Sequence, residues 1–282
     1  MITIFTPTYN RAHTLPRLYK SLVAQNRPDF FEWLIVDDGS SDGTAELVKK
    51  FQDEQKISIR YYFQENAGKH IAINTALKLA KGEWFFTVDS DDYLRENALS
   101  TVQKIVEIIE KDTEGFTVIR FSDQIPFNLE DFGKKMWYEG DYEWPFHGEM
   151  IFCWRTDGAK KYPFPVFEGE KFCQESLVLR RMLAKHKVLW TDYVLLAGDY
   201  LEEGLTANLW KNMLKSPRYS MLNLSERMSA PNVTDVQKNS FAENYWDIAR
   251  HAKIPFSEAR KGMPWKYSAR YFLQKLTEKI SR

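Results

Sequence analysis

The sequence predicts an α/β protein: a mixed, mainly parallel sheet flanked by helices, followed by a helical C-terminal extension. Across residues 1–120, short apolar runs alternate with segments of helical periodicity, which is the pattern of β-α-β units. From about residue 123 an aromatic-rich stretch replaces this alternation, and beyond about residue 206 the pattern is polar and helical. We therefore divide the chain into segments 1–122, 123–205 and 206–282.

The first predicted strand is the apolar run 2–5, and a loop leads from it into a helix. Thr14 is predicted to cap that helix, with Pro16 in its first turn. The apolar residues of the helix recur at i, i+3, i+4, i+7 and i+8 and form one face: Leu15, Leu18, Tyr19, Leu22 and Val23. A strand at 31–36 and a helix around 45–51 follow.

The next elements repeat the alternation. After a strand at 57–63, a helix through 71–80 is expected to end at Gly82, which would serve as its C-terminal cap. The series is completed by three more elements: a strand at 83–88, a helix at 97–110 and a strand at 116–121.

Segment 123–205 is expected to be a second, irregular half packed on the sheet. Twelve aromatic residues lie between Phe132 and Phe172, interleaved with proline, glycine and charged residues. Most aromatic side chains at this density belong to a core, but an exposed tryptophan can also stack on a sugar. Trp137, Trp144 and Trp154 are the candidates for such a role.

Composition excludes several classes of protein. Lys plus Arg and Asp plus Glu both number 39, so the net charge is zero and nothing global favours nucleic-acid binding. The only two cysteines, Cys153 and Cys173, argue against a disulfide scaffold and are expected in the core. With no apolar run near the roughly 18 residues of a membrane span, we expect a cytoplasmic location, with contact at the inner membrane face as an open alternative.

The stretch "DSDD" places three carboxylates, Asp89, Asp91 and Asp92, directly after an apolar strand. Such a cluster repels itself unless a cation, basic neighbours or water neutralise it. An acidic loop cap is the simple interpretation. The alternative is a site for Mg²⁺ or Mn²⁺, which prefer carboxylate oxygens and are often completed by phosphate oxygens.

Three other polar segments also lie at loops of the predicted sheet. "TPTYNR" follows the first strand, "VDDGSSDGT" ends the second, and "ENAGKH" precedes a helix that begins near Lys69 and His70. A cation at a helix start is disfavoured by the helix dipole. If a phosphate binds there, the cation and the helix N-terminus both attract it. Asp37 or Asp38 offers a spare carboxylate for a base or ribose, although Asp, Ser and Gly also favour turns. Ligands bind at the carboxyl ends of the strands in such sheets, so these loops should converge.

Taken together and in this order, these four segments resemble the nucleotide-sugar-binding half of family 2 glycosyltransferases, the inverting enzymes of the GT-A fold. The resemblance is close over residues 1–120, and "FPVFEGEKFCQESLVLRRM" extends it to about residue 185. It implies a Rossmann-like GT-A domain and a role in bacterial polysaccharide or capsule synthesis. The implied donor is a nucleotide-diphosphate sugar, with uridine as the expected base.

The resemblance also implies roles for individual residues. Thr6, Pro7 and Tyr9 would contact the base together with Asp38, and Lys69 would contact phosphate. Asp89 would contact the ribose or a divalent Mn²⁺ or Mg²⁺ ion, and Asp91 would be the principal metal ligand. Asp92 would order the loop instead.

Inverting transfer also needs a base to take the proton of the acceptor hydroxyl. Family members place an acidic residue at the start of a helix in the second half, and Glu175 in "FCQESLVLRRM" matches that position. Its other interpretation is a carboxylate that favours the helix N-terminus electrostatically. Glu168 and Glu170 are nearby competitors. The acceptor is expected to be a carbohydrate or a lipid-linked molecule.

The C-terminal segment 260–282 has seven basic residues and one acidic residue, a local charge of +6. Its apolar residues form a helical stripe: Trp265, Ala269, Phe272, Leu273, Leu276 and Ile280. The stripe indicates either a helix on a membrane surface or a terminal helix docked on its own domain. "GDYLEEGLT", residues 198–206, resembles a segment that closes over the acceptor side in some relatives.

Three alternatives to a transferase were considered. A sugar nucleotidyltransferase would carry a glycine-rich, basic loop after the first strand, which "TPTYNR" lacks. A phospho-acceptor receiver needs only about 120 residues and leaves the second half unexplained. A non-catalytic relative that only binds nucleotide sugars is disfavoured by the presence of both Asp91 and Glu175.

Overall fold

The computed structural model describes residues 1–121, 136–138, 149–199, 204–205, 207–230 and 233–280. The chain forms two compact units. Met1–Phe164 with Arg180–Glu202 make the first, and Pro165–Leu179 with Glu203–Arg282 make the second. The division into 1–122, 123–205 and 206–282 stays a prediction, because compactness alone does not assign roles to segments.

The first unit begins with the predicted β-α-β series. Four strands pair in parallel in the order β3-β2-β1-β4. Strands β2 and β3 are added on one side of β1, and the chain then crosses back to place β4 on the other side. The elements are β1 (Ile2–Thr8), α1 (Leu15–Ala24), β2 (Phe31–Asp37), α2 (Thr44–Asp53), β3 (Ile59–Phe63), α3 (Lys69–Leu79) and β4 (Trp84–Thr87).

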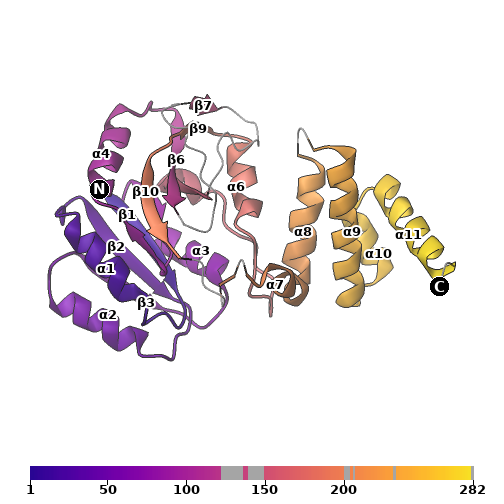
Figure 1. Ribbon diagram of the computed structural model, residues 1–282, viewed down its shortest axis with the longest axis horizontal. Coiled ribbons are helices and arrows are strands. Elements are labelled where there is room, and N and C mark those ends of the chain that lie inside the picture. Colours follow the sequence, from indigo (N-terminus) through magenta and orange to yellow (C-terminus); the bar gives the residue numbers. More distant parts are fainter. Residues whose placement is uncertain (122–135, 139–148, 200–203, 206, 231–232, 281–282) are drawn as a thin grey trace. The chain divides into compact units, whose positions relative to one another are not determined.

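Helices cover both faces of this parallel part, which is why β1 and β2 are buried along their whole length. Apolar side chains of α1 and α2 pack on one face, where Tyr19 stacks on Phe51 and both rings lie against Trp33. α3 packs on the other face, against β1 and β2 (Figure 1). The predicted apolar face of α1 is confirmed.

One predicted helix cap lacks its hydrogen bond, and another is wrong. Thr14 occupies the N-cap position of α1, with Pro16 in the first turn as predicted, but the Thr14 hydroxyl donates to the carbonyl of Arg11 and makes no capping hydrogen bond. α3 ends at Leu79, three residues before Gly82. Gly82 is small for another reason: a Cβ there would lie 2.2 Å from the backbone nitrogen of Thr3 on the adjacent strand.

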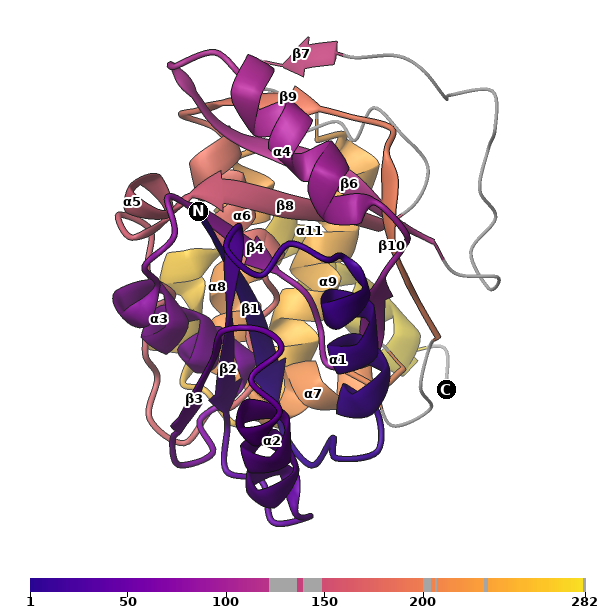
Figure 2. The same ribbon diagram turned by 90° about the vertical axis from the view of Figure 1, so that its left-hand side faces the viewer.

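The rest of the sheet is mixed, as predicted. β8 runs antiparallel between β4 and β6 (Figure 2). β5 is antiparallel to β10. Helix α4 packs on the same core as α1. The elements are β5 (Asp92–Leu94), α4 (Ala98–Ile108), β6 (Thr113–Phe121), β7 (Met136–Tyr138), β8 (Glu149–Arg155), α5 (Thr156–Ala159), α6 (Ser176–Leu183), β9 (Lys187–Trp190) and β10 (Val194–Gly198).

The second unit is helical, which confirms the predicted extension. Its own core gathers around Trp246 and Tyr245 of α9, with Met228 and Tyr271 from neighbouring helices. The elements are α7 (Leu209–Lys215), α8 (Pro217–Met228), α9 (Asp235–His251), α10 (Phe256–Ala259), a 3₁₀ turn (Arg260–Gly262) and α11 (Trp265–Ile280). Within the described residues, none of the helices has the length and apolar character to cross a bilayer.

Candidate functional site

The loops that follow β1 and β2 are joined to each other at the carboxyl edge of the sheet. The backbone N–H of Asn10 donates to Ser40 Oγ at 2.8 Å, and the backbone N–H of Ser41 donates to Asn10 Oδ1 at 2.9 Å. Ala12 N–H donates to Asp42 at 2.9 Å. Since β4 pairs with β1 on its other side, the loop after β4 leaves the same edge. The expected convergence of these loops is confirmed.

The carboxylates of Asp37 and Asp38 both accept hydrogen bonds from other residues of this chain. Asp37 accepts from the backbone N–H of Ser40 at 2.8 Å and from the hydroxyl of Tyr61 at 2.6 Å. The expectation of a spare carboxylate is therefore not met at Asp37. Asp38 is buried as well and bonds to the loop that precedes α3.

The carboxylate of Asp38 organises the segment 64–68. It accepts from Gln64 Nε2 at 2.8 Å, from Ala67 N–H at 2.9 Å and from Gly68 N–H at 2.7 Å. Gly68 has φ of 101°, a conformation that favours glycine, and directly precedes α3. Asp38 thus fixes the backbone that presents Lys69. No sequence pattern predicts this contact, because Asp38 follows β2 and Gln64 follows β3.

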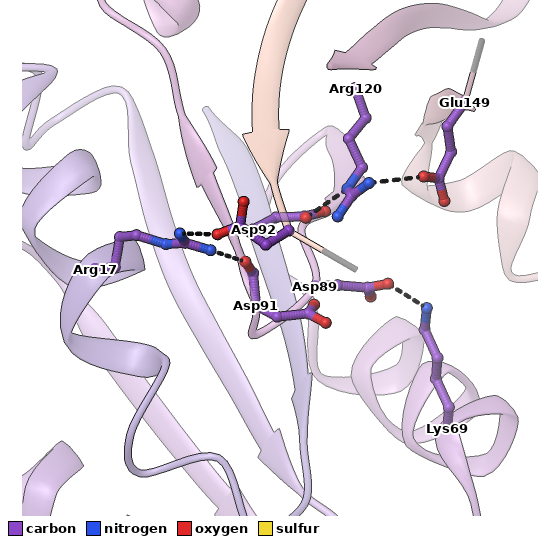
Figure 3. A network of polar contacts seen from close by, with 8 residues as sticks. Arg17, Lys69, Asp89, Asp91, Asp92, Arg120 and Glu149 are labelled. Carbon is purple, nitrogen blue, oxygen red and sulfur yellow. Dashed lines mark hydrogen bonds and ion pairs between the residues drawn. The ribbon is translucent and has the colours of Figure 1, made fainter. Parts of the chain in front are cut away.

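Lys69 begins α3 and reaches the aspartate cluster. Its Nζ bonds to Asp89 Oδ2 at 2.7 Å (Figure 3). The ammonium that opposes the helix dipole is therefore offset by a carboxylate from the loop after β4. Lys69 and Asp89 are brought together as the prediction of a shared phosphate and metal site requires.

Asp89, Asp91 and Asp92 lie together, with one oxygen from each within 4.8 Å of the others. Asp89 Oδ1 is buried and has no hydrogen-bond partner in the described part of the chain. Burial, then the charge of Asp89, raises the pKa of Asp91. Among the described residues, Asp89 thus has a buried oxygen without a hydrogen-bond partner, and the ionised form of the neighbouring Asp91 is disfavoured. A divalent cation bound to these oxygens would stabilise both carboxylates.

Asp92 differs from its two neighbours because it is held by an arginine. It opens β5, is buried, and accepts from Arg120 Nε at 2.5 Å, while Arg120 also bonds to Glu149 at 3.0 Å. Burial and the charge of Asp89 raise the pKa of Asp92 against the opposing effect of Arg120. A Cβ at Gly198 of β10 would lie 2.0 Å from Asp92 Oδ1, so glycine makes room for this pair. Asp92 orders the loop.

Arg17 of α1 approaches the cluster from the side opposite Lys69 (Figure 3). One guanidinium nitrogen donates to the backbone carbonyl of Asp91, and another bonds to Asp199 at 2.6 Å. The guanidinium also lies 4.7 Å from the ring centre of Tyr93. Sequence reasoning missed Arg17, which looks like an ordinary exposed residue of an amphipathic helix.

The residues predicted to contact a base differ in exposure. Thr6 and Pro7 lie inside β1 and are buried, and the Thr6 hydroxyl accepts from the indole N–H of Trp33 at 2.9 Å. Tyr9, just past the strand, is 49% exposed. Of these three, only the Tyr9 side chain is available to a ligand without a change in packing.

Glu175 lies in the second unit, at the start of α6. Its backbone carbonyl accepts from the N–H groups of Val178 and Leu179 at 3.1 Å, as expected of a residue that opens a helix. The competitor Glu170 is used differently. Its carboxylate accepts from Arg218 N–H at 3.0 Å and from Tyr219 N–H at 3.1 Å, which caps α8. Glu168 is exposed.

The remaining predictions concern aromatic and sulfur side chains. Trp154 is buried and stacks on Phe152 with ring centres 5.4 Å apart, so it is a core residue. Trp144 and the side chain of Trp137 lie outside the described residues, as do residues 200–203 and 206 of the "GDYLEEGLT" segment. Cys153 and Cys173 form no disulfide and are buried, which confirms their predicted core positions.

Comparison with known sequences places this site in context. Residues 3–166 match the family model described as glycosyl transferase family 2. An uncharacterized glycosyltransferase of Mycoplasma pneumoniae is 30% identical over 201 residues, which are 70% of this chain and 62% of that protein. The poly(ribitol-phosphate) β-N-acetylglucosaminyltransferase TarS of Staphylococcus aureus is 32% identical over 106 residues, covering 37% of this chain and 18% of TarS. The chain thus spans less than two thirds of the length of these relatives.

Comparison with solved structures shows the fold. TarS residues 1–349 in complex with UDP-GlcNAc give a TM-score of 0.63 at 18% identity, over 95% of this chain and 83% of that one. The mannosyltransferase PcManGT from Pyrobaculum calidifontis, in complex with GDP-Man and Mn²⁺, gives 0.59 at 16% identity, over 97% and 84%. The fold is therefore GT-A. Since the family model covers more than half of its 282 residues, the chain belongs to glycosyl transferase family 2.

Proposed function

We propose that the chain is a metal-dependent, inverting glycosyltransferase that moves a sugar from a nucleotide-diphosphate donor to an acceptor hydroxyl. The observation that carries this proposal is the unpaired, buried oxygen of Asp89 between Asp91 and the ammonium of Lys69. A diphosphate needs both positive charge and a metal ligand set, and this edge of the sheet offers the two side by side.

Asp91 and Asp89 would hold the divalent ion, Mn²⁺ or Mg²⁺. When bound, such an ion supplies a Lewis acid that stabilises the departing diphosphate. The choice of ligands follows from their contacts: an arginine bonds to the carboxylate of Asp92, whereas Arg17 donates to the backbone carbonyl of Asp91. The complex of PcManGT with Mn²⁺ supports metal use in this fold.

The nucleoside would bind over the ends of β1 and β2. Tyr9 has an exposed ring, and Thr6 and Pro7 lie near the carboxyl end of β1. Asp38 would contribute by holding the 64–68 segment, which presents Lys69. We propose a UDP-sugar as the donor, in line with the complex of TarS with UDP-GlcNAc.

Glu175 would act as the base that removes the proton of the acceptor hydroxyl. It opens α6, which is the position that the resemblance gives to the acidic residue of family members, and a carboxylate there can accept the proton of a hydroxyl. Glu170 is a weaker candidate because both of its oxygens accept hydrogen bonds from α8. A positioned base is worth a factor of about 10²–10⁴ in rate.

The acceptor would be a carbohydrate or a lipid-linked molecule used in cell-surface polysaccharide synthesis, and a cytoplasmic location is part of the same proposal. TarS, named for transfer to poly(ribitol-phosphate), supports an acceptor of this kind. No contact in the structure favours a sugar nucleotidyltransferase over this function, within the residues described.

The test is a transfer assay with a panel of UDP- and GDP-sugars in the presence of Mn²⁺. We expect one donor to release nucleoside diphosphate in an acceptor-dependent reaction, with inversion at the anomeric carbon shown by NMR of the product. Release of pyrophosphate from a nucleoside triphosphate and a sugar phosphate would support the nucleotidyltransferase instead. Retention at the anomeric carbon would contradict the single displacement.

A further inference from the structure

Helix α11 carries two separate apolar faces, of which only one packs on the rest of its unit. The packed face contains Ser268 and Tyr271, and Tyr271 is only 3% exposed. The Ser268 hydroxyl accepts from the indole N–H of Trp246 at 3.2 Å. The Tyr271 hydroxyl donates to Asp247 at 2.7 Å and accepts from Arg250 at 3.1 Å. These contacts dock α11 on α9.

The second face is the stripe predicted from the sequence, and most of it faces solvent. Trp265, Leu273 and Leu276 are 69%, 64% and 57% exposed. At helical spacing these positions fall in one row, offset from Ser268 and Tyr271. Phe272 lies between the two faces and packs partly on the core, and the Ile280 side chain lies outside the described residues. Docking of α11 therefore uses Phe272 at the edge of the stripe but leaves Trp265, Leu273 and Leu276 exposed.

Basic side chains surround this exposed stripe. Arg270 and Lys266 follow it along one side of the helix, and Lys261 precedes the helix; all three are exposed, and the ammonium of Lys266 lies 3.0 Å from Asp235. The segment 260–282 carries a charge of +6 in a chain whose net charge is zero. An apolar row beside concentrated positive charge is complementary to a surface that offers both acyl chains and anionic headgroups.

We propose that the exposed stripe of α11, Trp265, Leu273 and Leu276, docks on the surface of an anionic membrane. The helix would lie in the plane of the interface, because its 16 residues are too few to span a bilayer, which takes about 20. The stripe would enter the boundary between headgroups and acyl chains, while Lys266 and Arg270 contact the headgroups.

A second copy of the chain fits the stripe less well. Two copies meeting through the same stripe would bring two +6 segments together, and their repulsion opposes the contact at low salt. Anionic lipid instead neutralises that charge. A membrane can therefore bury the apolar side chains among acyl chains and neutralise the basic side chains with its headgroups.

The experiment uses the full chain and point variants, because truncation before α10 would remove Ala259, Met263 and Tyr271 from the core of the second unit. Co-sedimentation is measured with vesicles of phosphatidylcholine alone and of phosphatidylcholine mixed with phosphatidylglycerol. We compare Leu273→Ser and the double variant Leu273→Ser/Leu276→Ser with Ile108→Ser, which makes the same change at an exposed apolar residue of α4.

We expect binding to the anionic vesicles and little to the neutral ones. Each leucine removed should weaken binding about tenfold, while Ile108→Ser binds normally. Arg270→Gln should weaken binding about fivefold, and added salt should weaken it further. Because no donor or acceptor is present, the result does not depend on the transfer reaction.

Two outcomes would overturn the proposal. The first is equal binding by the double variant and the unchanged chain, which would mean that the stripe does not enter the membrane. The second is failure of the unchanged chain to bind anionic vesicles, combined with a dimer that the double variant converts to monomer, which would make a second copy the occupant. Thermal unfolding of each variant checks that the exposed substitutions leave the fold intact.

Discussion

Aspartates at the edge of the sheet differ in what their oxygens contact. Asp38 accepts three hydrogen bonds from the 64–68 segment, and Asp92 is held by Arg120. Within the described residues, Asp89 keeps one buried oxygen without a hydrogen-bond partner, and Asp91 lies beside it. The first pair builds the loops, and the second pair holds the ion in the proposed function. This division of roles follows from the partners, since all four residues have the same side chain.

Gly198 is the residue on which the Asp92–Arg120 pair depends most directly. A Cβ there would lie 2.0 Å from Asp92 Oδ1 and 2.7 Å from Arg120, so Gly198→Ala must displace the pair. We expect a loss of about 1–3 kcal/mol in the free energy of unfolding, measured by chemical denaturation. Gly158→Ala is the matched control, because its new Cβ would meet only the flexible end of Glu114. Similar stability of the two variants would show that the pair tolerates displacement.

At the scale of elements, two acidic residues of one segment have separate structural roles. Glu170 caps α8, whereas Glu175 opens α6. Glu170→Gln removes one charged acceptor and should lower the stability of the second unit by about 1 kcal/mol, with transfer unchanged.

Glu175→Gln should lower the transfer rate about 10²–10⁴-fold and leave donor binding intact. Normal transfer by Glu175→Gln would assign the base elsewhere.

Most elements of the first 121 residues could be predicted from the sequence, because apolar strands and amphipathic helices are local patterns. β5 could not, since its three residues begin with Asp92 and show no apolar alternation. The cap predicted at Gly82 failed for a related reason. Glycine is required there because a Cβ would clash with the backbone of Thr3, which is 79 residues away in the chain.

The same limit applies to the candidate site. The residue types and spacing of Asp89, Asp91 and Lys69 identified the cluster, because each follows a strand or begins a helix. Arg17 and the hydrogen-bonded state of Asp38 were not predictable, since their partners come from other elements of the fold. Which carboxylates are spare is a tertiary property.

At the scale of the whole molecule, Asp91 belongs to the first compact unit and Glu175 to the second. The end of the first unit is anchored where the chain leaves it. Asn74 of α3 exchanges two hydrogen bonds with the backbone of Phe164, both at 2.9 Å. The same helix therefore carries Lys69 at its start and fixes the chain just before the segment that contains Glu175.

The stability of the molecule should depend on pH through His70. This side chain of α3 is buried, and burial lowers its pKa to about 4. The unfolded chain binds a proton below about pH 6.5, whereas the folded chain does so only below about pH 4. The contribution is therefore complete above about pH 6.5 and is lost as pH falls toward 4. Between about pH 7 and about pH 5 the loss should be about 2 kcal/mol.

Denaturation followed by tryptophan fluorescence at the two pH values measures this loss. His70→Gln, which cannot gain the proton, should lose about 2 kcal/mol less than the unchanged chain over the same interval. If both proteins lose the same stability, other groups account for the pH dependence.

The central claim is that Asp89 and Asp91 form a metal-dependent site for a nucleoside diphosphate. Its most direct test is calorimetric titration of UDP into the chain with Mn²⁺ and again with a chelator, for the unchanged protein and for Asp91→Asn. We predict binding that requires Mn²⁺ and weakens by at least about tenfold in Asp91→Asn, because a charged ligand is lost. Equal affinity for UDP with Mn²⁺ and with the chelator would contradict the claim.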